Sequence, residues 1–472
     1  LIREIDAEGG STRTYYDDAS NPIMSIDANG NVHSSTFDVY GRVQTYTNPV
    51  GETTTYTYNA AGDLTSVSSV APNGATATTA FVLNADGRAV ETHLPDGTVT
   101  YATYNAHGDV TSMTDAKGNV TTYAYDTRCN IVLTVDALGG ETTATFDLAN
   151  RLTSTTDTRG ATTTFVWNAA DRMTSMTDAL GNVTTYVYDV NDSLVSETDA
   201  LGRTTTYEHN VNLQVTAVTR ADGSRYEYEY DAEHRLIKQI NPDGTFRTFE
   251  YDGLGREVAT VDEAGERWLT EYDAVGNAIA MTDPDGGSTA VEYDAMSRAV
   301  KIINAEGGER AVQYRPTGLV GVETDESGFS TSYDYDVMGR QTAIAYPDGT
   351  SESRSYDANG NLAAATDQRG LVTSFQYDAL DRQVGITDPL GGQWATEFDS
   401  EGNRTRAVDP RGNATTWTYD LLGRATSSTD ALGGTITTTH NAAGEVLTTS
   451  DQLGRTTAFT YDRWGAWHRR GR

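Results

Sequence analysis

The strongest constraint on this chain is a repeat of 21 residues that runs through almost all of it. Each copy has an aromatic residue, here called the anchor, followed by Asp or Asn, two variable positions, usually Gly, and often Arg or Asn. The 22 anchors are Tyr16, Phe37, Tyr58, Leu83, Tyr104, Tyr125, Phe146, Trp167, Tyr188, His209, Tyr230, Tyr251, Tyr272, Tyr293, Tyr314, Tyr335, Tyr356, Tyr377, Phe398, Tyr419, His440 and Tyr461. A fixed period of this size is typical of repeat architectures, in which each unit buries its surface against its neighbours.

A second motif lies half a period after each anchor. It reads Asp-Ala-Leu-Gly at residues 136–139, 178–181, 199–202 and 430–433, and its glycine is present in all 22 copies, from Gly9 to Gly454. Asp or Asn at the first corner of a type I turn accepts a backbone N–H, and Gly at the fourth accommodates a positive φ. Each repeat therefore has an anchor turn, directly after the anchor, and a glycine turn.

The residues between the turns predict strands. Runs such as residues 130–135 and 141–146 are rich in Thr, Val, Tyr and Phe. We predict an all-β fold, a long antiparallel β-ribbon of about 22 tandem repeats, on the order of 210 Å long at a strand spacing of about 4.8 Å. Right-handed strand twist should coil such a ribbon into a spiral, forming an open or hollow shell.

The two faces of the ribbon differ in character. Aromatic residues often occupy both the anchor and the position two before it, as in Tyr186 and Tyr188. The position between them is glutamate in five successive repeats, from Glu208 to Glu292. Like charges about 9.6 Å apart cost only about 0.4 kcal/mol in water but would be prohibitive if buried. We therefore predict a hydrated glutamate face, and an aromatic face that packs or lines an interior on the concave side.

The array is predicted to be one continuous domain, residues 1–465, followed by a basic non-repeat tail, residues 466–472. One interval, from Tyr58 to Leu83, is 25 residues, apparently with two extra residues on each side of Gly74. We expect this irregular repeat to contain a bulge or a longer loop, with the register recovered by Tyr104.

Composition excludes several partner classes. The net charge of −33 disfavours nucleic acid and anionic membranes. No apolar run is long enough to span a membrane, and no signal peptide opens the chain. The apolar fraction of 37% is also compatible with disorder, but regular aromatic and glycine columns disfavour that alternative. The first residue is Leu in mid-repeat, so we expect a fragment.

No candidate chemistry emerges from the remaining polar residues. Cys129 occupies a Gly position in an anchor turn without a positioned base, and is interpreted as a tolerated substitution. Asp136, Asp157, Asp178 and Asp199 are interpreted as turn caps, since calcium-binding repeats have shorter periods and ligands two residues apart. The histidines lack metal-ligand spacing, and two of them replace aromatic anchors: His33, His93, His107, His209, His234, His440 and His468. We therefore predict no catalytic, cofactor-binding or metal residues, no cofactor, and a protein that is not an enzyme.

The repeated phrase resembles the RHS/YD-repeat family, which includes polymorphic toxins of bacteria, insecticidal toxin subunits and teneurins. The resemblance rests on Tyr/Phe-Asp-x-x-Gly-Arg, as in residues 37–43 and 251–256, with Asp-Pro-x-Gly at 388–391 and 409–412, and it covers essentially residues 1–465. It implies a ribbon that spirals into a hollow shell, typically around a C-terminal toxin. The chain departs from the family in showing neither the self-cleaving core segment nor a toxin, and residues 464–472 turn basic. Truncation is favoured over a specific basic tail.

Two functions remain open, one implied by the resemblance and one by the repeated aromatic residues. The first is a non-catalytic shell segment of a toxin that is secreted or delivered to the cell surface, with a C-terminal toxin cargo and the missing shell and core segments as partners. The alternative is a cell-surface adhesin whose aromatic residues bind cell-wall carbohydrate. The two differ in whether the anchor rings line an interior or form open pockets.

Overall fold

The computed structural model describes residues 1–71, 73–461 and 467–469. Within these residues there are 45 strands and no helix, which confirms the predicted all-β ribbon. Each strand pairs antiparallel with its neighbours in sequence, as in β12–β13 and β13–β14. Two kinds of strand alternate, the anchor strand, which ends at the anchor, and the return strand, which follows the anchor turn.

The anchor strands are β2 (Ser11–Tyr16), β4 (Val32–Phe37), β6 (Thr53–Tyr58), β8 (Thr76–Leu83), β10 (Val99–Tyr104), β12 (Val120–Tyr125), β14 (Glu141–Phe146), β16 (Thr162–Trp167), β18 (Val183–Tyr188), β20 (Thr204–His209), β22 (Arg225–Tyr230), β24 (Phe246–Tyr251), β26 (Arg267–Tyr272), β28 (Ser288–Tyr293), β30 (Glu309–Tyr314), β32 (Ser330–Tyr335), β34 (Ser351–Tyr356), β36 (Val372–Tyr377), β38 (Gln393–Phe398), β40 (Ala414–Tyr419), β42 (Thr435–His440) and β44 (Thr456–Tyr461).

The return strands are β1 (Ile2–Ile5), β3 (Pro22–Ile26), β5 (Val43–Thr47), β7 (Leu64–Val70), β9 (Ala89–His93), β11 (Val110–Thr114), β13 (Ile131–Val135), β15 (Leu152–Thr156), β17 (Met173–Thr177), β19 (Leu194–Thr198), β21 (Val215–Thr219), β23 (Leu236–Ile240), β25 (Glu257–Val261), β27 (Ala278–Thr282), β29 (Ala299–Ile303), β31 (Val320–Thr324), β33 (Gln341–Ala345), β35 (Leu362–Thr366), β37 (Gln383–Thr387), β39 (Arg404–Val408), β41 (Ala425–Thr429), β43 (Val446–Ser450) and β45 (Trp467–Arg469).

The glycine turns have the predicted chemistry. All 22 glycines lie at positive φ, between 74° and 90°. In the turn of residues 136–140, the N–H of Gly139 donates to the carbonyl of Asp136 at 3.0 Å. The Asp136 carboxylate accepts the backbone N–H groups of Leu138 and Gly140, both at 2.8 Å. The aspartate therefore satisfies two backbone donors that would otherwise rely on water.

A β-bulge recurs beside every anchor from Tyr16 to His440. In the β18–β19 pair, Val187 lies opposite Ser196 and Tyr188 opposite Leu194, so Val195 is an extra residue on the return strand. The same shift occurs at 21 equivalent places. Because a bulge bends its strand and increases the local twist, repeating it at one place in each repeat bends the ribbon in a constant sense.

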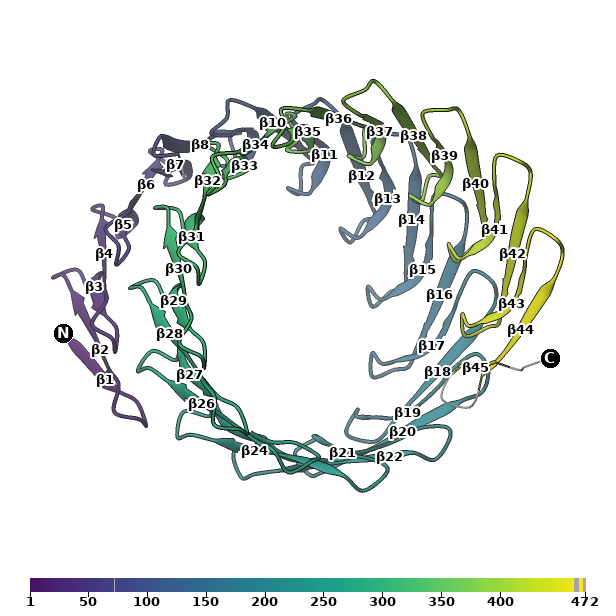
Figure 1. Cartoon of the computed structure of the whole chain (residues 1–472), viewed down its shortest axis with the longest axis horizontal. Coiled ribbons are helices and arrows are strands. Elements are labelled where there is room, and N and C mark those ends of the chain that lie inside the picture. Colours follow the sequence, from purple (N-terminus) through teal and green to yellow (C-terminus); the bar gives the residue numbers. More distant parts are fainter. Residues whose placement is uncertain (72, 462–466, 470–472) are drawn as a thin grey trace.

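The ribbon coils through more than one and a half turns, and the second turn lies alongside the first (Figure 1). Hydrogen bonds between the turns join residues 240 to 264 positions apart, commonly 242 to 244. One turn therefore contains about eleven and a half repeats. The wall is a single sheet with little interior of its own, since only six apolar residues of the described chain are buried: Ala71, Ala161, Ala217, Ala259, Val291 and Ile344.

The irregular repeat is not bulged in its glycine-turn hairpin, contrary to expectation. Strands β7 and β8 pair without interruption, from Ser66 opposite Ala80 to Val70 opposite Thr76. The four extra residues lengthen each strand by two, and the turn closes normally with the N–H of Gly74 donating to the carbonyl of Ala71 at 2.8 Å. An insertion of two residues preserves the alternation of faces, so no bulge is needed to restore register.

The predicted tail falls largely outside the described residues. Of residues 466–472, the backbone of Trp467–Arg469 forms β45, which pairs with β44. The ribbon therefore extends one strand beyond the last anchor.

Candidate functional site

The anchor side chain joins each repeat to the preceding one. The hydroxyl of Tyr251 donates to the carbonyl of Leu236 at 2.7 Å, and the indole N–H of Trp167 donates to the carbonyl of Leu152 at 2.7 Å. The acceptor is always 15 residues before the anchor. The bond is formed by Tyr58, Tyr104, Tyr125, Trp167, Tyr188, Tyr230, Tyr251, Tyr272, Tyr293, Tyr314, Tyr335, Tyr356, Tyr377 and Tyr419.

The arginine of the anchor turn makes a second link, to the following repeat. In Arg256, Nε donates to the carboxylate of Asp252 at 2.6 Å, and Nη1 donates to the carbonyl of Asp273 at 2.9 Å. Its guanidinium lies 4.8 Å from the ring centroid of Tyr272. Equivalent arginine-over-anchor contacts occur at Tyr58, Tyr104, Tyr251, Tyr314, Tyr356 and Phe398.

These links give the Tyr-Asp-x-x-Gly-Arg phrase a structural role. In seven repeats an arginine covers the next anchor ring, and fourteen anchors, nearly all of them tyrosines, reach back across one hairpin. Desolvation, with a further contribution from Glu257, raises the pKa of Tyr251 above its ordinary value, as expected for a phenol whose hydroxyl is a committed donor. The sequence showed the phrase but not these partners, although the recurrent Gly-Arg pair was a signal for them.

The two turns of the spiral meet along a seam formed by different turn types. The glycine turns between residues 6 and 203 belong to the first turn of the spiral. They contact the anchor turns between residues 252 and 445, which belong to the second turn of the spiral. Asn29 donates to the carboxylate of Asp273 at 2.8 Å, and the N–H of Gly253 donates to the Glu8 carboxylate at 2.8 Å. Arg203 forms an ion pair with Glu445 at 2.6 Å.

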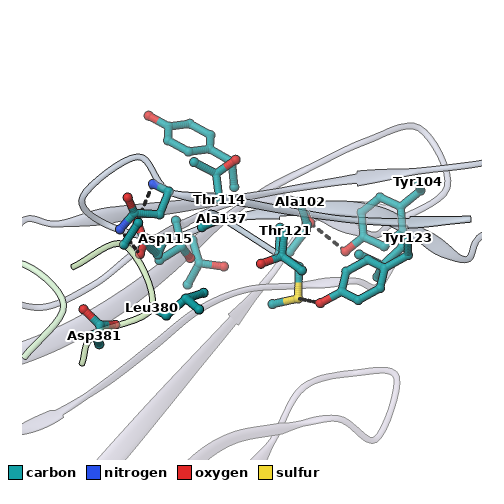
Figure 2. Close-up of a pocket in the computed structure, with 17 residues that line it drawn as sticks. Ala102, Tyr104, Thr114, Asp115, Thr121, Tyr123, Ala137, Leu380 and Asp381 are labelled. Carbon is teal, nitrogen blue, oxygen red and sulfur yellow. Dashed lines mark hydrogen bonds between the residues drawn. The ribbon is translucent and has the colours of Figure 1, made fainter. Parts of the chain in front are cut away.

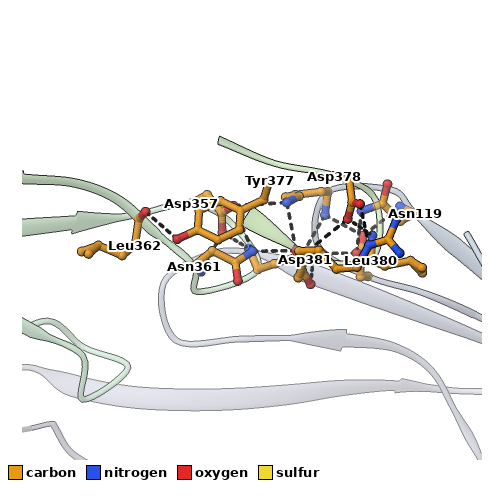
Figure 3. Close-up of polar contacts among 12 residues, drawn as sticks. Asn119, Asp357, Asn361, Leu362, Tyr377, Asp378, Leu380 and Asp381 are labelled. Atoms are coloured by element: carbon orange, nitrogen blue, oxygen red, sulfur yellow. Dashed lines mark hydrogen bonds and ion pairs between the residues drawn. The ribbon is translucent and has the colours of Figure 1, made fainter. Parts of the chain in front are cut away.

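The most highly connected part of the seam surrounds Lys117. Its ammonium lies 3.2 Å from the carboxylate of Asp357 and 3.0 Å from that of Asp381. Figure 3 shows Asp357, Asn361 and Asp381 beside Asn119 of the first turn, and Asn361 donates to Asp381 at 2.6 Å. Burial acts to lower the pKa of Lys117, but its hydrogen bonds to Asp381 and Asp357 outweigh burial and raise that pKa. The lysine therefore pairs with carboxylates of two successive anchor turns at once.

A cavity of about 590 Å³ lies beside this cluster, between the turns (Figure 2). Tyr104 and Tyr123 line it on the aromatic face, and Leu380 and Asp381 reach it from the second turn. Three of its polar groups are already engaged, since Tyr104 donates to Ala89, Tyr123 contacts the sulfur of Met113 at 3.8 Å, and Asp115 caps its own turn. These three groups therefore stabilise the fold rather than face the cavity as free groups.

The cysteine and the two histidine anchors noted in the sequence occupy turn and strand positions of the repeat. Cys129 lies in the anchor turn at φ 66°, and desolvation together with Asp109 raises its pKa, opposite to an activated thiolate. His209 and His440 stand opposite Val215 and Val446, as the other anchors stand opposite their return strands. Among the described residues no group of three His, Cys, Asp or Glu side chains could hold a metal ion.

The glutamate face is hydrated, as predicted, but four of its five glutamates are paired with a cation. Glu208 forms an ion pair with Arg225 at 2.6 Å, and Glu250 with Arg267 at 2.6 Å. These glutamates remain at least half exposed. The pKa of Glu208 is lowered first by its hydrogen bond to Arg225. Such exposed pairs contribute little stability but remove the repulsion along the column.

The structure is a thin coil of β-hairpins whose successive turns are joined along their edges by hydrogen bonds and ion pairs. This architecture defines a class of protein, the repeat-built β-shell. A family model described as RHS Repeat matches residues 37–80, 316–351, 356–393 and 398–435, and one described as Teneurin YD-shell matches 103–252 and 144–320. The chain belongs to the RHS/YD-repeat family, as its repeat phrase predicted.

Solved structures share the fold. The crystal structure of TcdB2-TccC3 is similar with a TM-score of 0.75 and 14% identity over 98% of this chain and 32% of that chain. TcdB2-TccC3-Cdc42 gives a TM-score of 0.72 at 14% identity, over 98% of this chain and 34% of that one. The Photorhabdus luminescens Tc holotoxin pore carrying TccC3-D651A gives 0.52 at 13% identity, over 98% and 30%. The chain thus spans about a third of the chains it resembles, and no curated protein matches its sequence. No helix of the described residues is long and apolar enough to cross a membrane.

Proposed function

We propose that this chain is a segment of the wall of a toxin-enclosing β-shell, in a protein that is secreted or delivered to a cell surface. Its role is structural, with no catalytic step. One observation carries the proposal: the ribbon winds alongside itself, and residues about 242 positions apart join its edges. An edge-joined coil makes a more continuous wall than an open solenoid, in which successive turns do not touch.

The likeness to chains of a Tc holotoxin supports the toxin context. The shared region is about a third of those chains. We therefore propose a C-terminal toxin as the cargo and further shell and core segments as partners. The aromatic face would line the inside of such a wall and the glutamate face the outside.

The anchor rings are poor platforms for carbohydrate. Sugar stacking needs an open aromatic face, but an arginine covers seven of the anchors, and Arg404 lies 4.1 Å from the ring centroid of Trp417. Fourteen anchors also have their polar atom committed to a carbonyl, as Tyr125 does at 2.6 Å to Val110. These contacts favour the shell over the adhesin.

The test uses the seam. The chain is expressed together with the core segment and the toxin proposed as its partners, and the toxin is challenged with protease. We expect protection by the native chain, loss of protection in Arg203→Glu and in Glu445→Arg, and recovery in the charge-swapped double variant. Recovery distinguishes an opened wall from a misfolded one, because only the pairing at 2.6 Å is restored.

A binding screen against peptidoglycan and cell-wall polysaccharides runs in parallel. Saturable micromolar binding that is lost when Tyr123, Tyr125 and Trp417 are changed to Ala, without protection of a toxin, would overturn the shell proposal in favour of the adhesin.

A further inference from the structure

The dipeptide Asn-Gly occurs three times in the chain, at Asn29, Asn73 and Asn359. Its asparagine is chemically labile, because the glycine that follows has no Cβ to hinder attack of its backbone nitrogen on the side-chain carbonyl carbon. The new N–C bond closes a cyclic imide, the bond to Nδ2 breaks, and Nδ2 leaves as ammonia with the proton of the glycine N–H. One water then opens the imide to aspartate or isoaspartate, so a neutral amide becomes a carboxylate.

Two of these asparagines lie in the seam, each at the third position of a turn that reads Asp-Ala-Asn-Gly-Asn. Asn29 donates through Nδ2 to the carboxylate of Asp273 at 2.8 Å. Asn359 donates to the carboxylate of Asp115 at 2.6 Å, and its side-chain oxygen accepts the N–H of Lys117 at 3.2 Å. In both places an amide on one turn of the spiral faces a carboxylate on the other turn of the spiral.

Asn73 provides a comparison within the same chain. It lies in the glycine turn of the irregular repeat and is exposed. Its side-chain oxygen accepts the N–H of Ala75 at 3.0 Å, and among the described residues its side chain has no hydrogen bond to the second turn of the spiral. Ring closure at Asn73 therefore breaks no contact across the seam, whereas ring closure at Asn29 or Asn359 must break one.

The seam matches charge at the position that Asn29 occupies, the third position of a glycine turn. Asp96 at the same position forms an ion pair with Arg340 at 3.2 Å. Lys117 at the same position forms one with Asp357, also at 3.2 Å. A charged side chain at this position therefore has an opposite charge across the seam.

Deamidation of Asn29 would break this match. Burial acts to raise the pKa of Asp273, but hydrogen bonds from Asn277 and Asn29 outweigh burial and lower that pKa, so the carboxylate is ionised at neutral pH. An aspartate in place of Asn29 would remove the N–H donor and set a second carboxylate against Asp273. Asn359 is in the same situation, since its amide also lies 3.0 Å from the carboxylate of Asp381. Two like charges in contact oppose closure of the seam.

We propose that Asn29 and Asn359 are deamidation sites that make an opening of the seam irreversible. While the seam is closed, ring closure must first break the bonds to Asp273 and Asp115. The reaction therefore proceeds from the locally open state, with water as the co-reactant. The carboxylate that forms then opposes reclosing, so the wall loosens in one direction as the protein ages. This inference rests on the seam and not on a toxin cargo.

The first experiment follows the three asparagines by peptide mapping and mass spectrometry while the chain is kept in mildly alkaline buffer. We expect Asn73 to convert about tenfold faster than Asn29 and Asn359, or more, since a hydrogen bond to a charged group contributes at least about that factor. Asp273→Asn removes the acceptor of the Asn29 amide. This variant should raise the conversion of Asn29 by about the same factor and leave that of Asn359 unchanged.

The second experiment measures the consequence by hydrogen exchange at residues 273–277. Asn29→Asp should accelerate exchange there about tenfold, and the matched control Asn73→Asp should not. The double variant, Asn29→Asp with Asp273→Asn, exchanges the amide and the carboxylate across the seam. It should restore native exchange, because one donor again faces one acceptor.

Both substitutions are compatible with the repeat. Asparagine already occupies the position of Asp273 in six anchor turns, at Asn59, Asn84, Asn105, Asn168, Asn210 and Asn441. Aspartate already occupies the position of Asn29 in five glycine turns, at Asp96, Asp222, Asp243, Asp285 and Asp348. The variants should therefore fold, and recovery in the double variant separates repulsion from misfolding.

Several outcomes would overturn the proposal. They are the absence of conversion at Asn73, equal conversion of all three asparagines, and a conversion of Asn29 that Asp273→Asn does not change. Equal exchange in Asn29→Asp and Asn73→Asp would also overturn it. Protease protection of a toxin is not measured here, so these outcomes are separate from the fate of the shell.

Discussion

Replacing Gly139 by valine isolates the cost of backbone conformation in a glycine turn. Gly139 lies at φ 84°, a region that costs a residue with a side chain about 1 to 2 kcal/mol and costs a β-branched residue more. A Cβ built on Gly139 meets no atom within 4 Å, so steric clash adds nothing. We therefore expect Gly139→Val to destabilise its hairpin locally by about 1 to 3 kcal/mol.

A repeat array opens locally, so the assay is hydrogen exchange at the turn and its strands rather than a global melt. Leu138 and Gly140 donate their N–H groups to Asp136 and report on the turn directly. The expected loss corresponds to roughly 5- to 150-fold faster exchange at β13 and β14.

Two controls test the reasoning. Gly139→Asn should cost less than about 1 kcal/mol, since Asn tolerates the left-handed region. Thr143→Ser, on the hydrated face of β14, should be nearly neutral. Equal exchange in the Val and Asn variants would refute the conformational argument, since it would show that φ is not what the glycine provides.

Three further outcomes are expected. Lys117→Met should weaken the seam by about 1 kcal/mol, seen as faster exchange at residues 357–361 and 378–382, because Asp357 and Asp381 lose their shared cation; unchanged exchange would contradict this. Tyr251→Phe should cost about 0.5 to 1.5 kcal/mol at β23 and β24 by removing the bond to Leu236, whereas Tyr226→Phe, at a ring stacked on Arg220, should cost little; equal effects would count against the anchor tie. Hydrogen bonds to Asn130 and Arg151 lower the pKa of Asp126 and Asp147 below about 3.8. The stability that these two carboxylates contribute is therefore present above that pH and is lost as pH falls below it, and a melting temperature by circular dichroism that is constant from pH 5 to 2 would refute this.

The sequence predicted what depends on local chemistry. Strands and turns followed from two turn phrases read within a few residues, as at Asp136 and Gly139, and the hydrated face followed from the glutamate column. It did not predict the ion pair of Arg203 with Glu445, because partners 242 residues apart meet only through the curvature of the whole ribbon. That curvature depends on the bulge beside each anchor, which has no residue signature. The bulge expected between Tyr58 and Leu83 was wrong because an insertion of two residues per strand keeps both faces in phase.

Anchor turns and glycine turns differ in whether they require glycine at the position of positive φ, and the contacts of that position explain why. Nine anchor turns place a residue other than glycine at positive φ, whereas all 22 glycine turns keep glycine. In five of these anchor turns that side chain bonds the preceding repeat, as Asp171 does to Arg151 at 2.8 Å and Asp381 to Asn361 at 2.6 Å. A hydrogen bond to a charged group contributes about 1.5 to 3 kcal/mol, which offsets the backbone cost.

At the glycine turns no such compensation exists, since a Cβ at Gly139 or Gly181 points into open space. Most anchor-turn glycines instead face the preceding repeat, as Gly62 faces Arg42 at 3.2 Å from a Cβ, whereas Gly276 and Gly402 face open space. The absolute preference for glycine on one edge therefore reflects the absence of a partner for any side chain placed there. Glycine is not required there for lack of space. An edge that carries glycine at this position is also free to lie against the next turn of the spiral.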